Sequence, residues 1–405
     1  MNKEKIGIIG LGKLGLPMLS AFVSRGFDVF GYDLSEKLIT TLKSGSNPYK
    51  EPGIDKVIGS DVAWSNRFFH KLEKLIEEVD VLFLIVPTPT KGETFDISFL
   101  QTSLDDICTI AARKNKKITC VITSTVNPGD TNTLQEQVKD KASGLINLVY
   151  SPEFIALGSV LKDMLYPDVV LLGGEHLESV DKIFSIYSRL YLSFPEYHRL
   201  SFFEAETAKI AINTYVTTKI SYANMVGMFI EKTTGSRLSS QKVLNAIGGD
   251  SRIGRKYFKY GLSYGGPCFP RDNIAFTSHL VRNSINASIP KATDDINNSV
   301  LDYWSEKINA EKFDALVLGG LAYKEGTDFL EESFMIKLGN LMGKNKIPVF
   351  YYDDLVSSYD NFINLNQGSH HDKLGAFNKV LVLKNYGEYN FNKELKNLSV
   401  INVWN

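Results

Sequence analysis

The stretch KIGIIGLGKLG at residues 5–15 sets the fold of the first part of the chain. A short apolar run, typical of a buried strand, leads into Gly10, Gly12 and Gly15, and a helical pattern follows. Glycines at this spacing allow a tight turn and let backbone N–H groups approach a pyrophosphate at the helix N-terminus. The next predicted strand ends in Asp33, whose carboxylate can bind the ribose hydroxyls of NAD and would repel the 2′-phosphate of NADP. The stretch therefore predicts an NAD site.

The rest of the chain divides into three regions by pattern. Strand-like apolar runs alternate with helix-length segments to about residue 175, which predicts a parallel sheet covered on both faces. Residues 202–234 lack proline and contain one glycine, so they predict a single long helix. Alternation returns after residue 312. We predict an α/β protein with two Rossmann-like, doubly wound domains joined by a helical domain with a long central helix, bounded at 1–195, 196–308 and 309–405.

Composition narrows the class of protein. The chain has 405 residues and a formal net charge of −1, so no broad attraction to nucleic acid or anionic membrane is expected. No uncharged apolar run approaches the ~18 residues of a membrane span, and the histidines show no metal-ligand spacing. Lys13 interrupts the apolar start, which argues against a signal peptide. The few cysteines predict reduced thiols in the cytoplasm, and the apolar surroundings of Cys108 and Cys120 predict inert core positions.

A third cysteine lies in a different kind of sequence, GGPCFPRD at residues 265–272. Pro270 can be the first residue of a helix, which would place Cys268 just ahead of the helix N-terminus. The positive helix end and Arg271 would favour the thiolate, and the paired glycines allow something bulky to approach the backbone. Asp272 follows one helical turn after the cysteine. This is the setting of a nucleophile.

Lys209 and Asn213 are one turn apart on the predicted long helix and therefore share a face. Apolar residues surround them, so the lysine either extends to solvent or points into a polar site. The helix alone leaves both alternatives open.

Together these stretches resemble the nucleotide-sugar 6-dehydrogenase family, also called the UDP-glucose/GDP-mannose dehydrogenase family. The similarity covers almost the full length, and an ordered set of motifs is far more specific than any one of them. The motifs are GLGKLG, NPYKEPGIDKVI, VPTPTKG, STVNPGDT, SPEFIALGSVLKDMLYPD, AKIAIN, GGDSRIG, GGPCFPRD and GLAYKEGTD. Members oxidise UDP-glucose to UDP-glucuronate, and relatives oxidise UDP-N-acetylhexosamines or GDP-mannose.

The resemblance implies catalytic roles at matching positions. Cys268 would be the nucleophile, and Glu153 the residue that serves thioester hydrolysis. Lys209 and Asn213 would stabilise charge that develops on the sugar C6 oxygen, and Asp272 would hold or activate a water there. These roles suit a chemistry in which an alcohol loses two hydrides and the intermediate aldehyde is trapped on sulfur.

Binding roles follow from the same resemblance. Cofactor contacts would be made by Thr88, Thr125 and Arg271, with Thr125 also placing a water. Substrate contacts are implied for Glu153, Phe154, Lys209, Asn213, Arg252, Tyr257, Gly265 and Lys324. Because Arg252 would reach in from a neighbouring subunit, the resemblance implies a homo-oligomer, dimer or higher. The N-terminal domain would bind NAD, the central domain would form the dimer, and the C-terminal domain would bind the UDP-sugar.

Three positions depart from the family pattern, all expected on the cofactor side. Leu38 stands where a basic residue is common, Leu157 where a second glutamate is common, and Glu331 where an arginine is expected. They leave open a catalytically inactive NAD-binding scaffold or sensor. A simple one-hydride dehydrogenase of a hydroxy acid would share the layout but has no use for Cys268. Within the family, a UDP-N-acetylhexosamine or GDP-mannose substrate remains an alternative to UDP-glucose.

Overall fold

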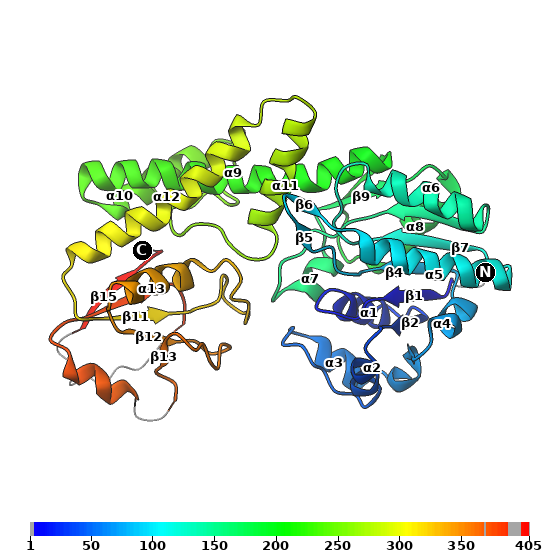
Figure 1. The fold of residues 1–405 in the computed structure, drawn as a ribbon, viewed down its shortest axis with the longest axis horizontal. Coiled ribbons are helices and arrows are strands. Elements are labelled where there is room, and N and C mark those ends of the chain that lie inside the picture. Colours follow the sequence, from blue (N-terminus) through cyan, green and yellow to red (C-terminus); the bar gives the residue numbers. More distant parts are fainter. Residues whose placement is uncertain (1–3, 368–369, 388–397, 405) are drawn as a thin grey trace. The chain divides into compact units, whose positions relative to one another are not determined.

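The computed structural model describes residues 4–367, 370–387 and 398–404 (Figure 1). The chain forms two compact units, residues 1–210 and 211–405. The predicted division into three domains at 195/196 and 308/309 stays a prediction. No helix in the described part of the chain is long and apolar enough to cross a membrane.

The first unit is built on an eight-stranded sheet with the order β10-β9-β8-β7-β4-β1-β2-β3. Its strands are β1 Ile6–Ile9, β2 Val29–Tyr32, β3 Phe68–Phe69, β4 Val81–Leu84, β7 Ile118–Ile122, β8 Ile146–Tyr150, β9 Val169–Gly173 and β10 Glu196–Leu200. A small hairpin pairs β5 Thr90–Lys91 with β6 Thr94–Phe95. The helices are α1 Gly15–Ser24, α2 Glu36–Lys43, α3 Ile54–Ser60, α4 Leu72–Glu78, α5 Ser98–Lys114, α6 Asp130–Ala142, α7 Val160–Leu165 and α8 Leu177–Leu190, with a 3₁₀ turn at Trp64–Arg67.

Helices cover both faces of this sheet, which confirms the doubly wound prediction. One apolar cluster joins Ile6, Ile8 and Phe83 to α1, α7 and α8. A second cluster joins Leu82 and Leu84 to α4, α5 and α6. Strand residues that are buried on both faces explain why these runs are almost continuously apolar rather than alternating.

The expectation of an all-parallel sheet is wrong at one edge. Strand β9 pairs with β8 in the antiparallel sense, and β10 is parallel to β9. The segment between β8 and β9 holds only the short helix α7, which packs against α1. The chain therefore re-enters the sheet from the edge where β8 ends. Helix α8 then forms the crossover that makes β9 and β10 parallel.

The second unit combines a helical part with a five-stranded parallel sheet of order β13-β12-β11-β14-β15. Helix α9 (Phe202–Thr234) begins in the first unit and continues here. It is followed by α10 Arg237–Gly248, α11 Phe269–Arg282 and α12 Ser288–Ala310. The sheet contains β11 Ala315–Gly319, β12 Val349–Tyr352, β13 Ile363–Asn364, β14 Val380–Lys384 and β15 Leu398–Asn402, with α13 Phe334–Lys344 and a 3₁₀ segment His370–Ala376.

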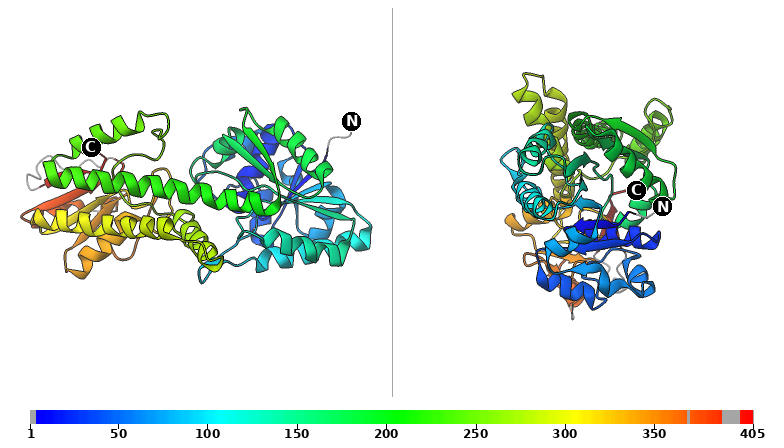
Figure 2. Two further views of the ribbon diagram at one scale, coloured as in Figure 1. Left: turned by 90° about the horizontal axis from the view of Figure 1, so that it is seen from above. Right: turned by 90° about the vertical axis from the view of Figure 1, so that its right-hand side faces the viewer.

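The bounds of α9 match the predicted range of 202–234. In the second unit α9 and α12 lie side by side (Figure 2). The Ser221 hydroxyl donates to the Thr293 carbonyl at 2.8 Å, and the hydroxyls of Thr218 and Thr293 are 3.1 Å apart. Gly227 is required in this helix because a Cβ there would lie 2.2 Å from the Tyr260 ring.

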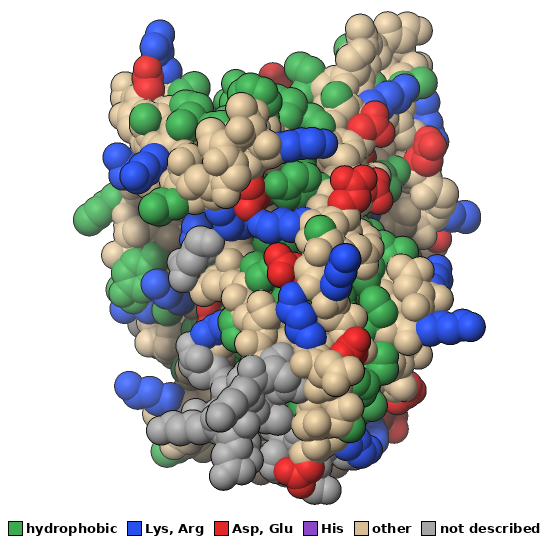
Figure 3. All heavy atoms as spheres, turned by 90° about the vertical axis from the view of Figure 1, so that its left-hand side faces the viewer, with side chains coloured by type: hydrophobic (Ala, Val, Ile, Leu, Met, Phe, Trp, Pro, Cys, Tyr) green, Lys and Arg blue, Asp and Glu red, His purple; other side chains and the backbone are tan. Residues whose placement is uncertain are grey.

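The surface of the second unit carries mixed charge. Figure 3 shows lysine and arginine side chains interspersed with aspartate and glutamate on the visible face. The pattern agrees with the near-zero formal net charge of the chain.

Candidate active site

The glycine-rich turn between β1 and α1 has the geometry that the sequence predicted. Gly10 has a positive φ of 90°, and a Cβ at this position would lie 2.1 Å from the carbonyl oxygen of Ile85. A Cβ on Gly15 would lie 1.8 Å from the carbonyl oxygen of Gly10. Around Gly12, in contrast, a Cβ would meet nothing within 4 Å. Two glycines therefore permit the fold, and the third leaves open space over the turn for a phosphate group.

The Asp33 carboxylate is held beside this turn. Its Oδ2 accepts from the Leu11 amide at 2.9 Å, and its Oδ1 accepts from the Ser35 amide at 2.9 Å. Each oxygen retains a lone pair that can accept a ribose hydroxyl. The turn and the carboxylate thus fit the two ends of an adenosine diphosphate group, as a dinucleotide site requires.

Thr88 and Thr125 lie at the same edge of the sheet. They follow β4 and β7, which run parallel to β1, so all three strands present their carboxyl ends together. The Thr88 hydroxyl donates to the Thr125 carbonyl at 2.7 Å. The Ser124 hydroxyl donates to the Val86 carbonyl at 2.7 Å and accepts from the Val86 amide at 3.1 Å. These bonds fix the two predicted threonines in one rigid loop pair.

Glu153 and Phe154 follow β8 at this edge, where Lys209 meets them. The Lys209 ammonium donates to the Glu153 carbonyl oxygen at 2.5 Å and lies 4.4 Å from the centroid of the Phe154 ring. Only 7% of Lys209 is exposed. The alternative that this lysine extends to solvent is therefore wrong, because the ammonium points into the segment that carries Glu153.

The Glu153 carboxyl has a raised pKa. Burial raises its pKa to about 7, and the nearby Lys209 ammonium partly opposes this shift. A carboxyl of this kind changes its charge near neutral pH and can take up or release a proton there.

Two further glutamates support this part of the site and were not singled out from the sequence. Glu51, in the NPYKEPG motif, accepts from the Gly158 amide at 3.1 Å and so holds the loop after Glu153. Glu206 is fully buried and accepts from the amides of Gly129 at 2.6 Å and Thr131 at 2.7 Å. In the sequence, Glu206 could have been recognised as an acidic residue among the apolar residues of the predicted long helix.

In the second unit, Cys268 is exposed and directly precedes α11. The sequence predicted Pro270 as the first residue of this helix. The helix in fact starts at Phe269, so Pro270 is its second residue. The thiol still lies at the helix N-terminus. Burial, followed by the charge of Cys268, raises the pKa of Tyr323 to about 12, which marks the phenol as a neighbour of the thiol.

Cys108 and Cys120 differ from Cys268, as expected. Both are fully buried. Burial raises the pKa of Cys108 to about 11 and raises that of Cys120 further, so both stay as thiols at neutral pH. The prediction that they are core residues is confirmed.

Asp272 is almost completely buried, one turn into α11. Its Oδ2 accepts from the Asn213 amide group at 2.6 Å, and its Oδ1 lies 3.4 Å from two guanidinium nitrogens of Arg271. Its backbone amide donates to the Cys268 carbonyl at 2.8 Å. The fold thus brings four predicted site residues of the second unit into one connected group.

The two glycines before Cys268 allow another segment of the same chain to pack closely against them. A Cβ on Gly265 would lie 2.1 Å from the Glu332 carbonyl oxygen, and a Cβ on Gly266 would lie 2.6 Å from the Tyr323 ring. The Gly266 amide donates to the Glu331 carbonyl at 3.2 Å. The bulky group expected at these glycines is therefore the 323–332 segment, and Glu331 contributes its backbone here.

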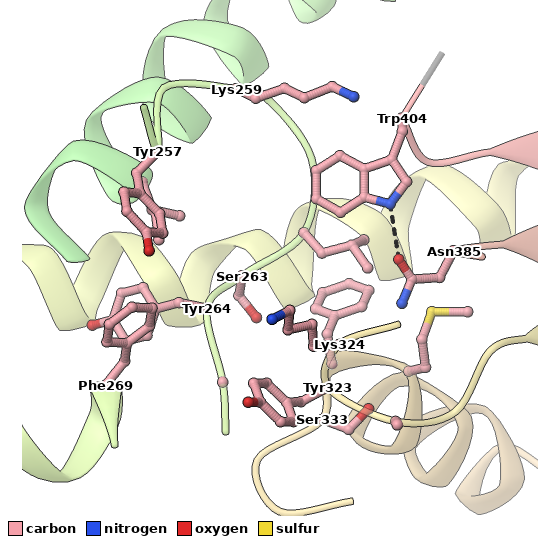
Figure 4. A pocket seen from close by; sticks show the side chains of 16 residues that line it. Tyr257, Lys259, Ser263, Tyr264, Phe269, Tyr323, Lys324, Ser333, Asn385 and Trp404 are labelled. Carbon is pink, nitrogen blue, oxygen red and sulfur yellow. Dashed lines mark hydrogen bonds between the residues drawn. The ribbon is translucent and has the colours of Figure 1, made fainter. Parts of the chain in front are cut away.

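A cavity of about 270 Å³ opens beside this segment, entirely within the second unit. Three predicted substrate residues line it, namely Tyr257, Gly265 and Lys324. Figure 4 shows Tyr257 and Lys324 around the cavity. Sequence reasoning missed Asn385 and Trp404, which line it from the last part of the described chain. Arg252 does not line this cavity; it is exposed and pairs with Asp250 at 2.7 Å.

The leucines at two family-atypical positions pack against the core of the first unit. Leu38 and Leu157 are partly buried against the apolar cluster of the first unit. No group of His, Cys, Asp and Glu within the described ranges could hold a metal ion.

Comparison with known proteins identifies the family. The family model for the NAD-binding domain of UDP-glucose/GDP-mannose dehydrogenases matches residues 4–191, and the model for the central domain matches residues 203–299. The chain belongs to the UDP-glucose/GDP-mannose dehydrogenase family. It is therefore an NAD-dependent nucleotide-sugar dehydrogenase, and the glycine turn with Asp33 lies within the part of the chain that matches the NAD-binding domain.

Three relatives illustrate the similarity within the family. UDP-glucose 6-dehydrogenase of Rickettsia bellii is 30% identical over 372 residues, covering 89% of this chain and 84% of the relative. UDP-glucose 6-dehydrogenase AglM of Haloferax volcanii is 29% identical, covering 87% and 84%. The structure of a UDP-glucose dehydrogenase from Pyrobaculum islandicum aligns with a TM-score of 0.85 and 24% identity, covering 100% of this chain and 98% of that one. This likeness confirms the predicted fold.

Proposed function

We propose that this family member oxidises the C6 alcohol of UDP-glucose to the uronic acid in two steps, through a covalent intermediate on Cys268. The observation that carries the proposal is the exposed thiol at the start of α11, followed one turn later by the buried, hydrogen-bonded Asp272. The two curated relatives above are named as enzymes of UDP-glucose. Reduced thiols and nucleotide sugars both suit a cytoplasmic enzyme.

The thiol has a defined part in this sequence of bonds. Bound NAD supplies the hydride acceptor for both oxidations. After the alcohol has lost a hydride and a proton, the Cys268 sulfur adds to the aldehyde carbon and the aldehyde oxygen takes up a proton. The resulting thiohemiacetal loses a second hydride and its hydroxyl proton to become a thioester. Water then adds to the thioester carbon, the carbon–sulfur bond breaks, and the carboxylate leaves as the thiol regains its proton.

Charged and polar side chains have roles in the same steps. The Lys209 ammonium and the Asn213 amide, one turn apart on α9, are donors for an alkoxide or tetrahedral oxyanion. Asp272 accepts from Asn213 and fixes the direction of its amide. The Glu153 carboxyl, with a pKa of about 7, is suited to accept a proton from the water that attacks the thioester.

The proposed activity is tested with a panel of nucleotide sugars offered with NAD or NADP. UDP-glucose with NAD should give the fastest formation of NADH, and Cys268→Ser should lower its turnover by about 10²-fold or more, because a hydroxyl is a weaker nucleophile than a thiolate. Thermal unfolding should be unchanged, since the side chain is exposed. Cys108→Ala, which removes a buried thiol, should keep its turnover. Near wild-type turnover of Cys268→Ser would exclude the sulfur intermediate. A faster rate with another nucleotide sugar would exclude UDP-glucose as the preferred substrate.

The raised pKa of Glu153 predicts a pH effect on thioester hydrolysis. Since the carboxyl is neutral below its pKa of about 7 and ionised above it, kcat should rise as the pH increases through this value. In Glu153→Gln this limb of the profile should vanish and kcat should fall by about 10²–10⁴-fold. Glu36→Gln, at an exposed position, is the control. A rising limb that survives in Glu153→Gln would show that another group titrates.

We further propose that the active enzyme is a dimer formed along α9. The part of α9 in the second unit carries large hydrophobic side chains at helical spacing that are exposed to solvent. They are Tyr215 (66% exposed), Tyr222 (48%), Met225 (41%) and Phe229 (69%). A face of this kind is unfavourable in water and is suited to pairing with a second copy of the same helix. Arg252 does not line the cavity of its own chain, which supports its predicted contribution to the site of the partner.

Subunit complementation tests this assembly. Arg252→Ala and Cys268→Ala should each be nearly inactive, but a mixture after subunit exchange should recover about a quarter of wild-type activity, because half of the dimers would be mixed and each would hold one intact site. A monomer by light scattering, or no recovery despite proven exchange, would contradict the shared site.

A further inference from the structure

One polar group in the cavity has its orientation fixed by chemistry. The Trp404 indole nitrogen lies 2.9 Å from Asn385 Oδ1 (Figure 4). An indole N–H can only donate, so the oxygen of the Asn385 amide must face Trp404. The amide nitrogen therefore points away from the indole and presents its N–H groups as donors. Both residues line the cavity.

Trp404 is itself held in place. The preceding Val403 is fully buried, and its carbonyl accepts from the Arg237 guanidinium. The Trp404 amide donates to Asn402 Oδ1 at 2.9 Å. The indole packs so closely on Gly261 that a Cβ there would lie 2.0 Å from the ring. The rigid indole can thus hold the Asn385 amide in one orientation.

The backbone under Asn385 is also fixed. Asn385 directly follows β14, and its backbone N–H donates to the Gly319 carbonyl oxygen at 2.9 Å. Among the residues that the structure describes, the Asn385 side-chain nitrogen makes no hydrogen bond. A donor group held on both sides and directed into a cavity is a recognition element for an acceptor of the ligand.

Other residues of the cavity define the kind of ligand. Leu262 and Phe334 supply apolar surface. Lys259 and Lys324 supply positive charge, with the Lys259 ammonium 5.0 Å from the Trp404 ring centroid. An apolar wall, cations and one oriented donor fit a flat heterocycle joined to a diphosphate.

We propose that Asn385, oriented by Trp404, reads the C4 carbonyl oxygen of the substrate's uracil base and thereby discriminates against cytosine, which carries an amino group at C4. Uracil presents a carbonyl acceptor where cytosine presents an amino donor. With cytosine, the amide N–H would face another donor, and a desolvated donor would be left without a partner. The assignment rests on the proposed function, since it concerns the nucleotide of that same substrate.

The test compares the binding of UDP, CDP and GDP by titration calorimetry, without turnover. Wild type should bind UDP at least ~10-fold more tightly than CDP. Asn385→Asp retains an acceptor for the indole N–H but replaces the donor by an oxygen. The added negative charge weakens both diphosphates alike, so the ratio of the two affinities is the readout. This ratio should fall to one or reverse in favour of CDP.

Trp404→Phe provides the second variant. It leaves Asn385 intact but removes the bond that orients its amide, so the UDP to CDP ratio should move towards one. Ser299→Ala, at an exposed position of α12 outside the cavity lining, should leave the ratio unchanged. Thermal unfolding identifies a variant that fails to fold.

The outcomes separate this inference from the proposed function. A wild type that binds UDP tightly, together with unchanged ratios in both variants, would overturn the role of Asn385 alone. A wild type that binds neither diphosphate would overturn both the inference and the proposed function. Tighter binding of GDP than of UDP would contradict the assignment of uracil.

Discussion

A buried carboxylate anchors α9, the helix that carries Lys209. Glu206, fully buried near the start of α9, accepts from two backbone amides at the start of α6. Burial raises its pKa to about 7, whereas the amides and the positive end of α6 favour the ionised form. Because the carboxylate is out of contact with solvent, α9 cannot slide or rotate without leaving a buried acceptor unpaired. Lys209, about one turn later, is therefore fixed where its ammonium reaches the Glu153 carbonyl.

The three cysteines of the chain differ in how far their thiols are buried. Cys108 and Cys120 lie in the apolar cluster between the sheet and its helices, where burial disfavours the thiolate. Cys268 is exposed at the start of α11. Asp272 lies one turn on, fixed by Asn213 and Arg271. Position in the fold, and not residue type, thus separates the two buried thiols from the exposed one.

Much of the fold follows from local sequence. The apolar runs of both sheets and the 202–234 helix lie where predicted, because buried strands and an uninterrupted helix each leave a local pattern. The family motifs also led to Lys209, Asn213, Cys268 and Asp272, which the structure places in two hydrogen-bonded groups. Features that need distant partners were missed. The antiparallel β8–β9 pair depends on where a loop re-enters the sheet. The Trp404–Asn385 bond depends on how two chain segments meet, which neither sequence segment reveals.

The central claim is that one enzyme carries out both oxidations and holds the aldehyde on Cys268 between them. It is tested most directly by a limiting amount of the best nucleotide sugar with excess NAD, run to completion. The account predicts two NADH per sugar, no free aldehyde, and a product that has gained one oxygen and lost two hydrogens. One NADH per sugar, with an aldehyde or ketone as the product, would contradict it.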